Sequence, residues 1–144
     1  MIKSTDIHTG GCMCGDVKFK ATGVPVVVAH CHCEECQRSS GAGHTTGAMF
    51  AVKNVSISGA LAKFNYQSRA GNTVTKSFCP KCGSALFGQN DGMADHVTIS
   101  LGTFDDSSKF EPEVVVFASN RKPWDLMGEK LMTFDKQPEW KPET

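Results

Sequence analysis

Seven cysteines in three closely spaced groups are the feature that most constrains this chain. Alternate residues of an extended segment lie on one face, so a C-x-C pair can hold a single ion. In a C-x-x-C-G motif, the glycine can adopt the left-handed conformation that turns backbone N–H groups toward sulfur. The groups are Cys12 and Cys14 in GGCMCG, then Cys31, Cys33 and Cys36 in HCHCEEC, and finally Cys79 and Cys82 in FCPKCG. This pattern predicts a fold organised around metal ions.

The number of cysteines favours one closed and one open site. Two pairs complete a tetrahedral four-thiolate shell, which is typical of a structural zinc, whereas a triplet leaves one position for a substrate. Spacing alone does not prove which pairs combine. Joining the first group to the third is the division that uses every cysteine and completes one shell. Soft thiolates favour zinc over calcium or magnesium.

Three other interpretations of the cysteines stay open at this point. Disulfides could use six of the seven, although reduced thiols are the rule in the cytosol. An iron–sulfur cluster could take four cysteines, although the typical cluster spacings are absent. Alternatively, His30, His32 or His44 could close the triplet, which would make both sites structural.

Composition restricts the class of partner. The chain has 144 residues, and its 15 Lys and Arg balance its 15 Asp and Glu. A protein that binds DNA or an anionic membrane normally carries a basic excess. There is no signal-peptide core and no run of roughly 18 apolar residues. We therefore expect one domain over residues 1–144, with its core at about 10–140, in the cytoplasm, with no nucleic-acid or membrane partner.

Short apolar alternations and frequent glycines predict a mostly β fold. One short helical turn is expected at residues 34–39, ended by Gly41. The tail over residues 120–144 is expected to wrap the body, with Trp124 and Trp140 as packing anchors. The expected strands are 17–21, 26–30, 47–50, 55–58, 63–67, 73–78, 85–87, 97–101 and 114–118.

The charge of the open site favours sulfur chemistry. Three thiolates on a dication leave a net charge of about −1, so this metal is a weaker Lewis acid than one held by neutral imidazoles. Activating water is then less favourable than binding an incoming thiol and holding it deprotonated.

The motifs GGCMCG, HCHCEECQRSSG, FCPKCGSALF and NRKPW, from residue 10 to about residue 140, resemble the glutathione-dependent formaldehyde-activating enzyme (Gfa, or centromere-protein-V) family. The resemblance implies an Mss4-like fold of twisted antiparallel sheets around two zinc ions. It also implies that Cys12, Cys14, Cys79 and Cys82 bind a structural zinc, and that Cys31, Cys33 and Cys36 bind a catalytic one.

The resemblance further implies a carbon–sulfur lyase. Such an enzyme condenses glutathione, or a similar thiol, with formaldehyde or another small aldehyde to give an S-hydroxymethyl adduct. The alternative is an Mss4-like zinc-binding interaction module without catalysis. Arg38, one turn from the triplet, and His44, after a flexible Gly-Ala-Gly stretch, are the expected substrate contacts.

Overall fold

The computed structural model describes residues 1–126, 131, 133, 135 and 136. In this part of the chain the elements are short strands, one α-helix and four 3-10 turns. The strands are β1 (Ile7–Gly11), β2 (Lys18–Thr22), β3 (Val27–Cys31), β4 (Thr45–Ala51), β5 (Val55–Ser58), β6 (Ala62–Gln67), β7 (Thr73–Phe78), β8 (Ala85–Asn90), β9 (His96–Ser100) and β10 (Val114–Val116). The helix is α1 (Glu34–Ser40), and the turns are η1 (Val52–Asn54), η2 (Asp91–Met93), η3 (Leu101–Thr103) and η4 (Ala118–Asn120).

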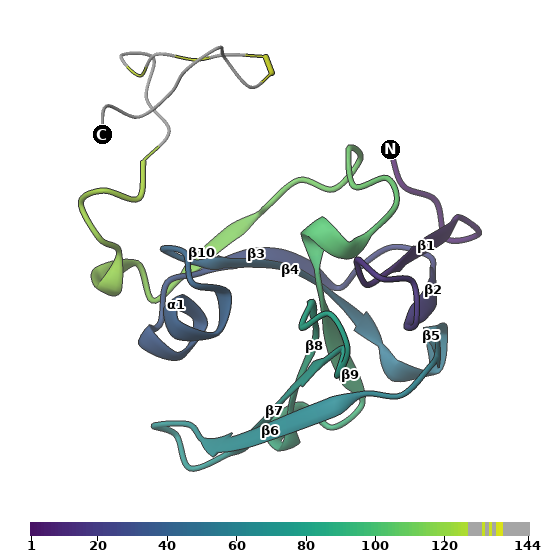
Figure 1. Cartoon of the computed structure of the whole chain (residues 1–144), viewed down its shortest axis with the longest axis horizontal. Helices are drawn as coiled ribbons and strands as arrows, with labels where there is room; N and C mark the ends of the chain where they lie inside the picture. The colour runs from purple at the N-terminus through teal and green to yellow at the C-terminus, as the bar shows by residue number, and fades with distance from the viewer. Residues whose placement is uncertain (127–130, 132, 134, 137–144) are drawn as a thin grey trace.

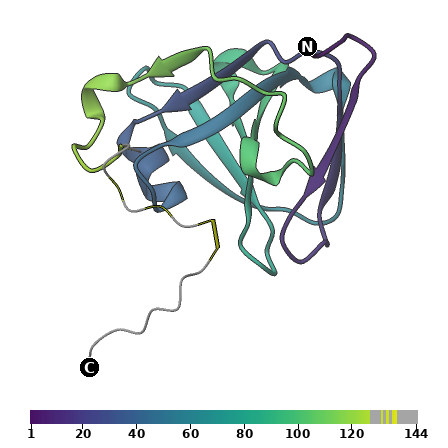
Figure 2. The same ribbon diagram turned by 90° about the horizontal axis from the view of Figure 1, so that it is seen from above.

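The strands form two sheets, which confirms the predicted mostly β fold of twisted sheets with one short helix. The larger sheet has seven strands in the order β10-β3-β4-β9-β8-β7-β6, and the smaller has the order β1-β2-β5. Neighbouring strands are antiparallel except β10, which pairs with β3 in parallel. The larger sheet twists strongly, so that β6 and β7 lie far below β3 and β4 in Figure 1. Seen from above, β10 lies at the edge next to β3 (Figure 2).

Most strand predictions agree with the structure to within one to three residues. The expectation that a strand would continue to Ala118 is wrong. Phe117 has a φ of +54°, which is outside the extended region, and Ala118 begins η4. Strand β1 was not predicted, because its sequence IHTGG contains two residues of low strand propensity. Five pairings with β2 hold it in the sheet.

The core lies between the small sheet and the central strands of the large one. Phe19 of β2 makes edge-to-face contact with Phe104 at 5.1 Å between ring centroids, and Phe104 contacts Phe110 at 4.8 Å. Leu86 and Ile99 are fully buried beside them. Aromatic pairs of this kind contribute beyond their buried area, so they hold the two sheets together.

The two faces of the β3–β4 pair have different roles. Val28 pairs with Ala48, and both face the core. Side chains alternate across a strand, so Cys31 of β3 and its partner Thr45 of β4 point to the opposite face. That face is covered by α1, which lies between β3–β4 and the β6–β7 hairpin in Figure 1.

Helix α1 has capping at both ends. The backbone N–H of Cys36 donates to the sulfur of Cys33 at the N-cap, and Gly41 has a φ of +68° at the C-cap. The predicted helix and its termination at Gly41 are therefore confirmed to within one residue. A left-handed C-cap favours glycine because a side chain there meets the backbone.

The predicted role of Trp124 as a packing anchor is wrong, since this residue is 67% exposed. Trp140 lies outside the described residues. In the described part of the chain, no helix has the length and apolar character that a membrane span requires.

Candidate metal centres

Four sulfurs from two distant loops form the first cluster. Cys12 and Cys14 follow β1, and Cys79 and Cys82 lie between β7 and β8. The sulfur of Cys14 is 3.6 Å from that of Cys12 and 3.7 Å from that of Cys79. Tetrahedral zinc with bonds of about 2.3 Å separates its sulfurs by about 3.8 Å. The spacing therefore fits a zinc-sized ion, and the first group of cysteines joins the third.

Backbone donors surround this cluster. The N–H of Val17 donates to Cys12 Sγ at 3.2 Å, and that of Cys82 to Cys79 Sγ at 3.5 Å. Gly83 has a φ of +75°, which gives the turn that the C-x-x-C-G motif predicts. Hydrogen bonds from the side chain and backbone of Ser84 lower the pKa of Cys82 to about 5. These donors favour the thiolate form that a metal requires.

The second cluster contains three sulfurs. Those of Cys31 at the end of β3, Cys33 at the helix N-cap and Cys36 within α1 lie within 4.8 Å of one another. Among the described residues, no histidine, aspartate or glutamate brings a fourth ligand atom into this group. All seven cysteines are free thiols in the structure.

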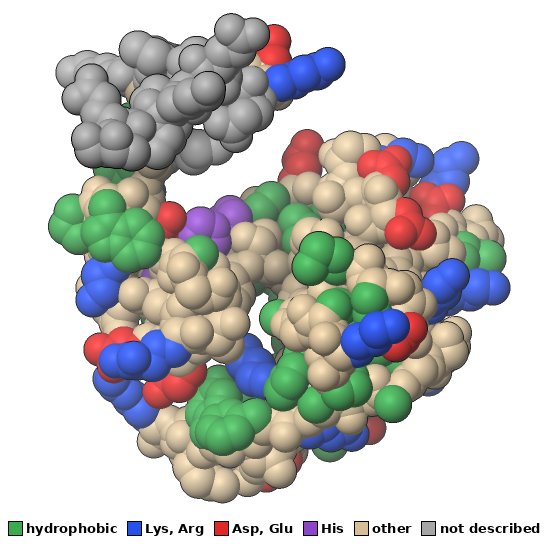
Figure 3. All heavy atoms as spheres, in the orientation of Figure 1, with side chains coloured by type: hydrophobic (Ala, Val, Ile, Leu, Met, Phe, Trp, Pro, Cys, Tyr) green, Lys and Arg blue, Asp and Glu red, His purple; other side chains and the backbone are tan. Residues whose placement is uncertain are grey.

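Two residues that sequence reasoning missed face this triplet from β6–β7. The Lys76 ammonium lies 3.9 Å from Cys36 Sγ. A hydrogen bond from Cys31 has the largest effect in lowering the pKa of the Cys36 thiol, and the positive charge of Lys76 lowers it further. Burial, and then the negative charges of Cys36 and Cys33, raise the pKa of Tyr66. Figure 3 shows a hollow in this face of the molecule, with a basic side chain inside it.

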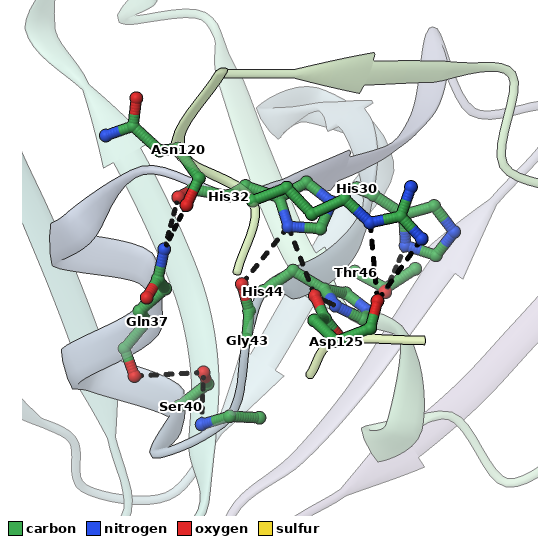
Figure 4. Close-up of polar contacts among 11 residues, drawn as sticks. His30, His32, Gln37, Ser40, Gly43, His44, Thr46, Asn120 and Asp125 are labelled. Carbon is green, nitrogen blue, oxygen red and sulfur yellow. Dashed lines mark hydrogen bonds and ion pairs between the residues drawn. The ribbon is translucent and has the colours of Figure 1, made fainter. Parts of the chain in front are cut away.

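His30, His32 and His44 lie on the other face of β3–β4. His30 contacts the hydroxyl of Thr46 at 2.7 Å, and its ring packs against that of His44 at 4.9 Å. His44 Nδ1 is 2.8 Å from Asp125 Oδ2, a contact that lowers the pKa of Asp125 (Figure 4). Thr45, which follows His44, instead contacts Cys36. The structure therefore brings His30, His32 and His44 together, but it does not bring His44 to the thiolates.

Arg38 lies in the last turn of α1 and is exposed. Helix positions two residues apart point in nearly opposite directions, since each residue turns the helix by about 100°. Arg38 therefore points away from Cys36, which is buried.

Comparison with known proteins identifies the family and the fold. Residues 7–120 match the family model described as glutathione-dependent formaldehyde-activating enzyme. A search of curated proteins gave no match. Among solved structures, a crystal structure of a Rhodobacter sphaeroides protein matches with a TM-score of 0.57 and 19% identity over 74% of this chain and 97% of that one, which shows likeness of fold. The cysteine clusters and the family match lead to one conclusion: the chain belongs to the glutathione-dependent formaldehyde-activating enzyme family.

Proposed function

We propose that this protein binds two zinc ions and condenses a glutathione-type thiol with formaldehyde, or another small aldehyde, to an S-hydroxymethyl adduct. In the reverse direction it is a carbon–sulfur lyase. The observation that carries the proposal is the contrast between the two clusters. One has four thiolates, whereas the other has three thiolates and no fourth protein ligand among the described residues.

The donor sets fit these roles. Cys12, Cys14, Cys79 and Cys82 would hold the structural zinc, and Cys31, Cys33 and Cys36 would hold the catalytic one. When bound to the triplet, zinc supplies an open position that takes a thiol in its deprotonated form. This role requires no protein base to remove the thiol proton.

Lys76 is proposed to compensate the charge of the reactants. Three thiolates and a dication carry about −1, and an incoming thiolate adds another negative charge. The ammonium is 3.9 Å from Cys36 Sγ, close enough to stabilise this charge. It would also stabilise the alkoxide that develops on the aldehyde oxygen as the carbon–sulfur bond forms.

Tyr66 is proposed to orient the aldehyde. It and Lys76 lie on the same face of the β6–β7 hairpin, because the paired positions 66–74 and 64–76 are two residues apart. Its raised pKa keeps the phenol protonated at neutral pH. The phenol can therefore donate a hydrogen bond to the carbonyl oxygen. The sulfur electron pair forms the new bond to carbon, the C=O π pair moves to oxygen, and a proton from water completes the hydroxymethyl group.

The condensation also proceeds spontaneously, so the test must compare its rate with and without the protein. Exchange NMR measures this rate. The rate of adduct formation is measured with zinc-loaded protein, with Cys33→Ser, and with buffer alone. The matched control is Arg38→Ala, whose side chain points away from Cys36. We expect acceleration by the wild type, retention in Arg38→Ala and loss in Cys33→Ser. A wild-type rate equal to buffer, with two zinc ions bound, contradicts the proposal and favours an interaction module.

A further inference from the structure

The histidine face of the β3–β4 pair carries a cluster that the thiol chemistry does not use. His32, His44 and Asp125 each offer one ligand atom, and these three atoms all lie within 4.8 Å of one another. The carboxylate oxygen is 3.2 Å from His32 and 2.8 Å from His44. Figure 4 shows the two rings directed at the carboxylate. Alternation of side chains places this cluster and the cysteine triplet on opposite faces of the strands.

The three groups come from separate segments and are held firmly. The side chain of His32 is 6% exposed and that of Asp125 is 15% exposed. His44 is 32% exposed, so solvent reaches the cluster from its side. The carboxylate fits because Gly43 has no side chain, since a Cβ at this position would overlap the Asp125 carboxyl group.

We propose that this cluster is a third metal site, which binds one divalent transition-metal ion through His32, His44 and Asp125. Two imidazoles and one carboxylate suit ions such as Zn²⁺, Co²⁺, Ni²⁺ and Fe²⁺. Ligand atoms about 2.1 Å from such an ion stand about 3.0 Å apart in octahedral geometry and about 3.4 Å apart in tetrahedral geometry. The measured separations of 2.8 and 3.2 Å lie close to these values.

A backbone carbonyl also lies beside the cluster. The carbonyl oxygen of Gly43 is 3.2 Å from His32 Nδ1, the same distance as Asp125 Oδ2. The single Nδ1–H of His32 can align well with only one of these two oxygens, so without a metal the other oxygen is left with a poorly aligned contact. With a metal, the protons of both histidines move to Nε2 and the Nδ1 lone pairs become ligands. The Gly43 carbonyl would then lie beside the ion as a further oxygen donor.

A bound ion would fasten the segment after β10 to the sheet. Asp125 lies 81 residues from His44 in sequence. Near it, the side chain of Gln37 donates to the carbonyls of both His32 and Asn120, which holds the same segment against α1 (Figure 4). The metal would therefore stabilise the outer wall of the fold without contacting the thiolates.

Cobalt binding to the full chain, loaded with two equivalents of zinc, tests the proposal. We expect one further Co²⁺ per chain, with ligand-field absorption and no sulfur-to-cobalt charge transfer. His44→Ala and Asp125→Asn should each weaken this binding about tenfold or more. His96→Ala, which changes a histidine on β9, should bind Co²⁺ as the wild type does.

Three results would overturn the proposal. They are no Co²⁺ bound beyond the two zinc ions, sulfur-to-cobalt charge transfer from the Co²⁺ that does bind, or binding of Co²⁺ by both variants as tight as by the wild type. If a variant does not fold, imidazole ¹⁵N NMR of the wild type decides the question. Adding a third equivalent of Zn²⁺ should shift the Nδ1 signals of His32 and His44, and unchanged signals contradict the site.

Discussion

Replacing Lys76 by methionine removes a charge beside the open thiolate site and keeps the length of the side chain. The ammonium lies 3.9 Å from Cys36 Sγ, and the residue is half-buried on β7. A substrate thiolate that joins the triplet would lie about one sulfur–sulfur separation from Cys36. The lysine should therefore stabilise the bound thiolate, and its removal should weaken thiol binding.

Coulomb's law sets the size of the effect. For a substrate thiolate at about 4 Å from the ammonium, two unit charges interact by about 1 kcal/mol in bulk water and about 4 kcal/mol at an effective dielectric constant of 20. Lys76 is partly exposed, so solvent screening favours the lower part of this range. We take about 1–2 kcal/mol, which corresponds to a change of about 5- to 30-fold in affinity.

Calorimetric titration of zinc-loaded protein with glutathione measures this change. The matched control is Lys63→Met. Lys63 is exposed on β6 and pairs with Ser77, so it lies on the opposite face of the hairpin from Lys76. We expect weaker binding by Lys76→Met, a smaller difference at high salt, and wild-type affinity for the control. Equal affinity of Lys76→Met and wild type at low salt would refute the electrostatic role of this lysine.

Three further predictions concern the thiolate clusters, the packing beside them and the histidine face. Cys79→Ser should lose one zinc and the cooperative thermal transition, whereas Cys33→Ser should lose one zinc and keep its circular dichroism; equal unfolding of both contradicts the open site. Gly10→Ala should lower the free energy of unfolding by about 1–3 kcal/mol in urea titrations, because a Cβ there would overlap a backbone carbonyl and a core aromatic ring. Carboxyl NMR should give Asp125 a pKa below its ordinary 3.8, and this pKa should rise in His44→Ala. The stabilising contact between Asp125 and His44 is therefore present above about pH 4 and is lost as pH falls through the lowered pKa. An unchanged pKa in the variant would show that His44 is not the cause.

The cysteine clusters could be predicted because their ligand spacing is local. The pairs within C-x-C and C-x-x-C-G are fixed by backbone geometry over two or three residues. Their combination is different, since Cys14 and Cys79 are 65 residues apart. The count of ligands proposed this pairing, and the fold confirms that the first and third groups meet.

The surroundings of the triplet could not be predicted in the same way. Lys76 reaches Cys36 across 40 residues, through the twist of a seven-stranded sheet that no local pattern specifies. Asp125 meets His44 across 81 residues. Contacts of this range depend on the whole topology, and a lysine within a β-strand carries no signal of its own.

The position of His44 illustrates how a strand boundary controls such a prediction. The sequence predicted a strand beginning at Gly47, which left His44 in a loop near the triplet. The strand instead begins at Thr45, whose β-branched side chain favours the extended backbone. Alternation then separates Thr45, which contacts Cys36, from His44, which joins His30 and His32 on the other face.

The most direct test of the account is zinc X-ray absorption on protein loaded with two equivalents of the metal, with and without glutathione. Seven cysteine sulfurs shared by two ions predict about 3.5 sulfurs per zinc at about 2.3 Å. Glutathione should raise this number to about 4, as its sulfur takes the open position beside Cys31, Cys33 and Cys36. A sulfur number that stays unchanged at saturating glutathione would contradict the central claim that this site binds a thiol.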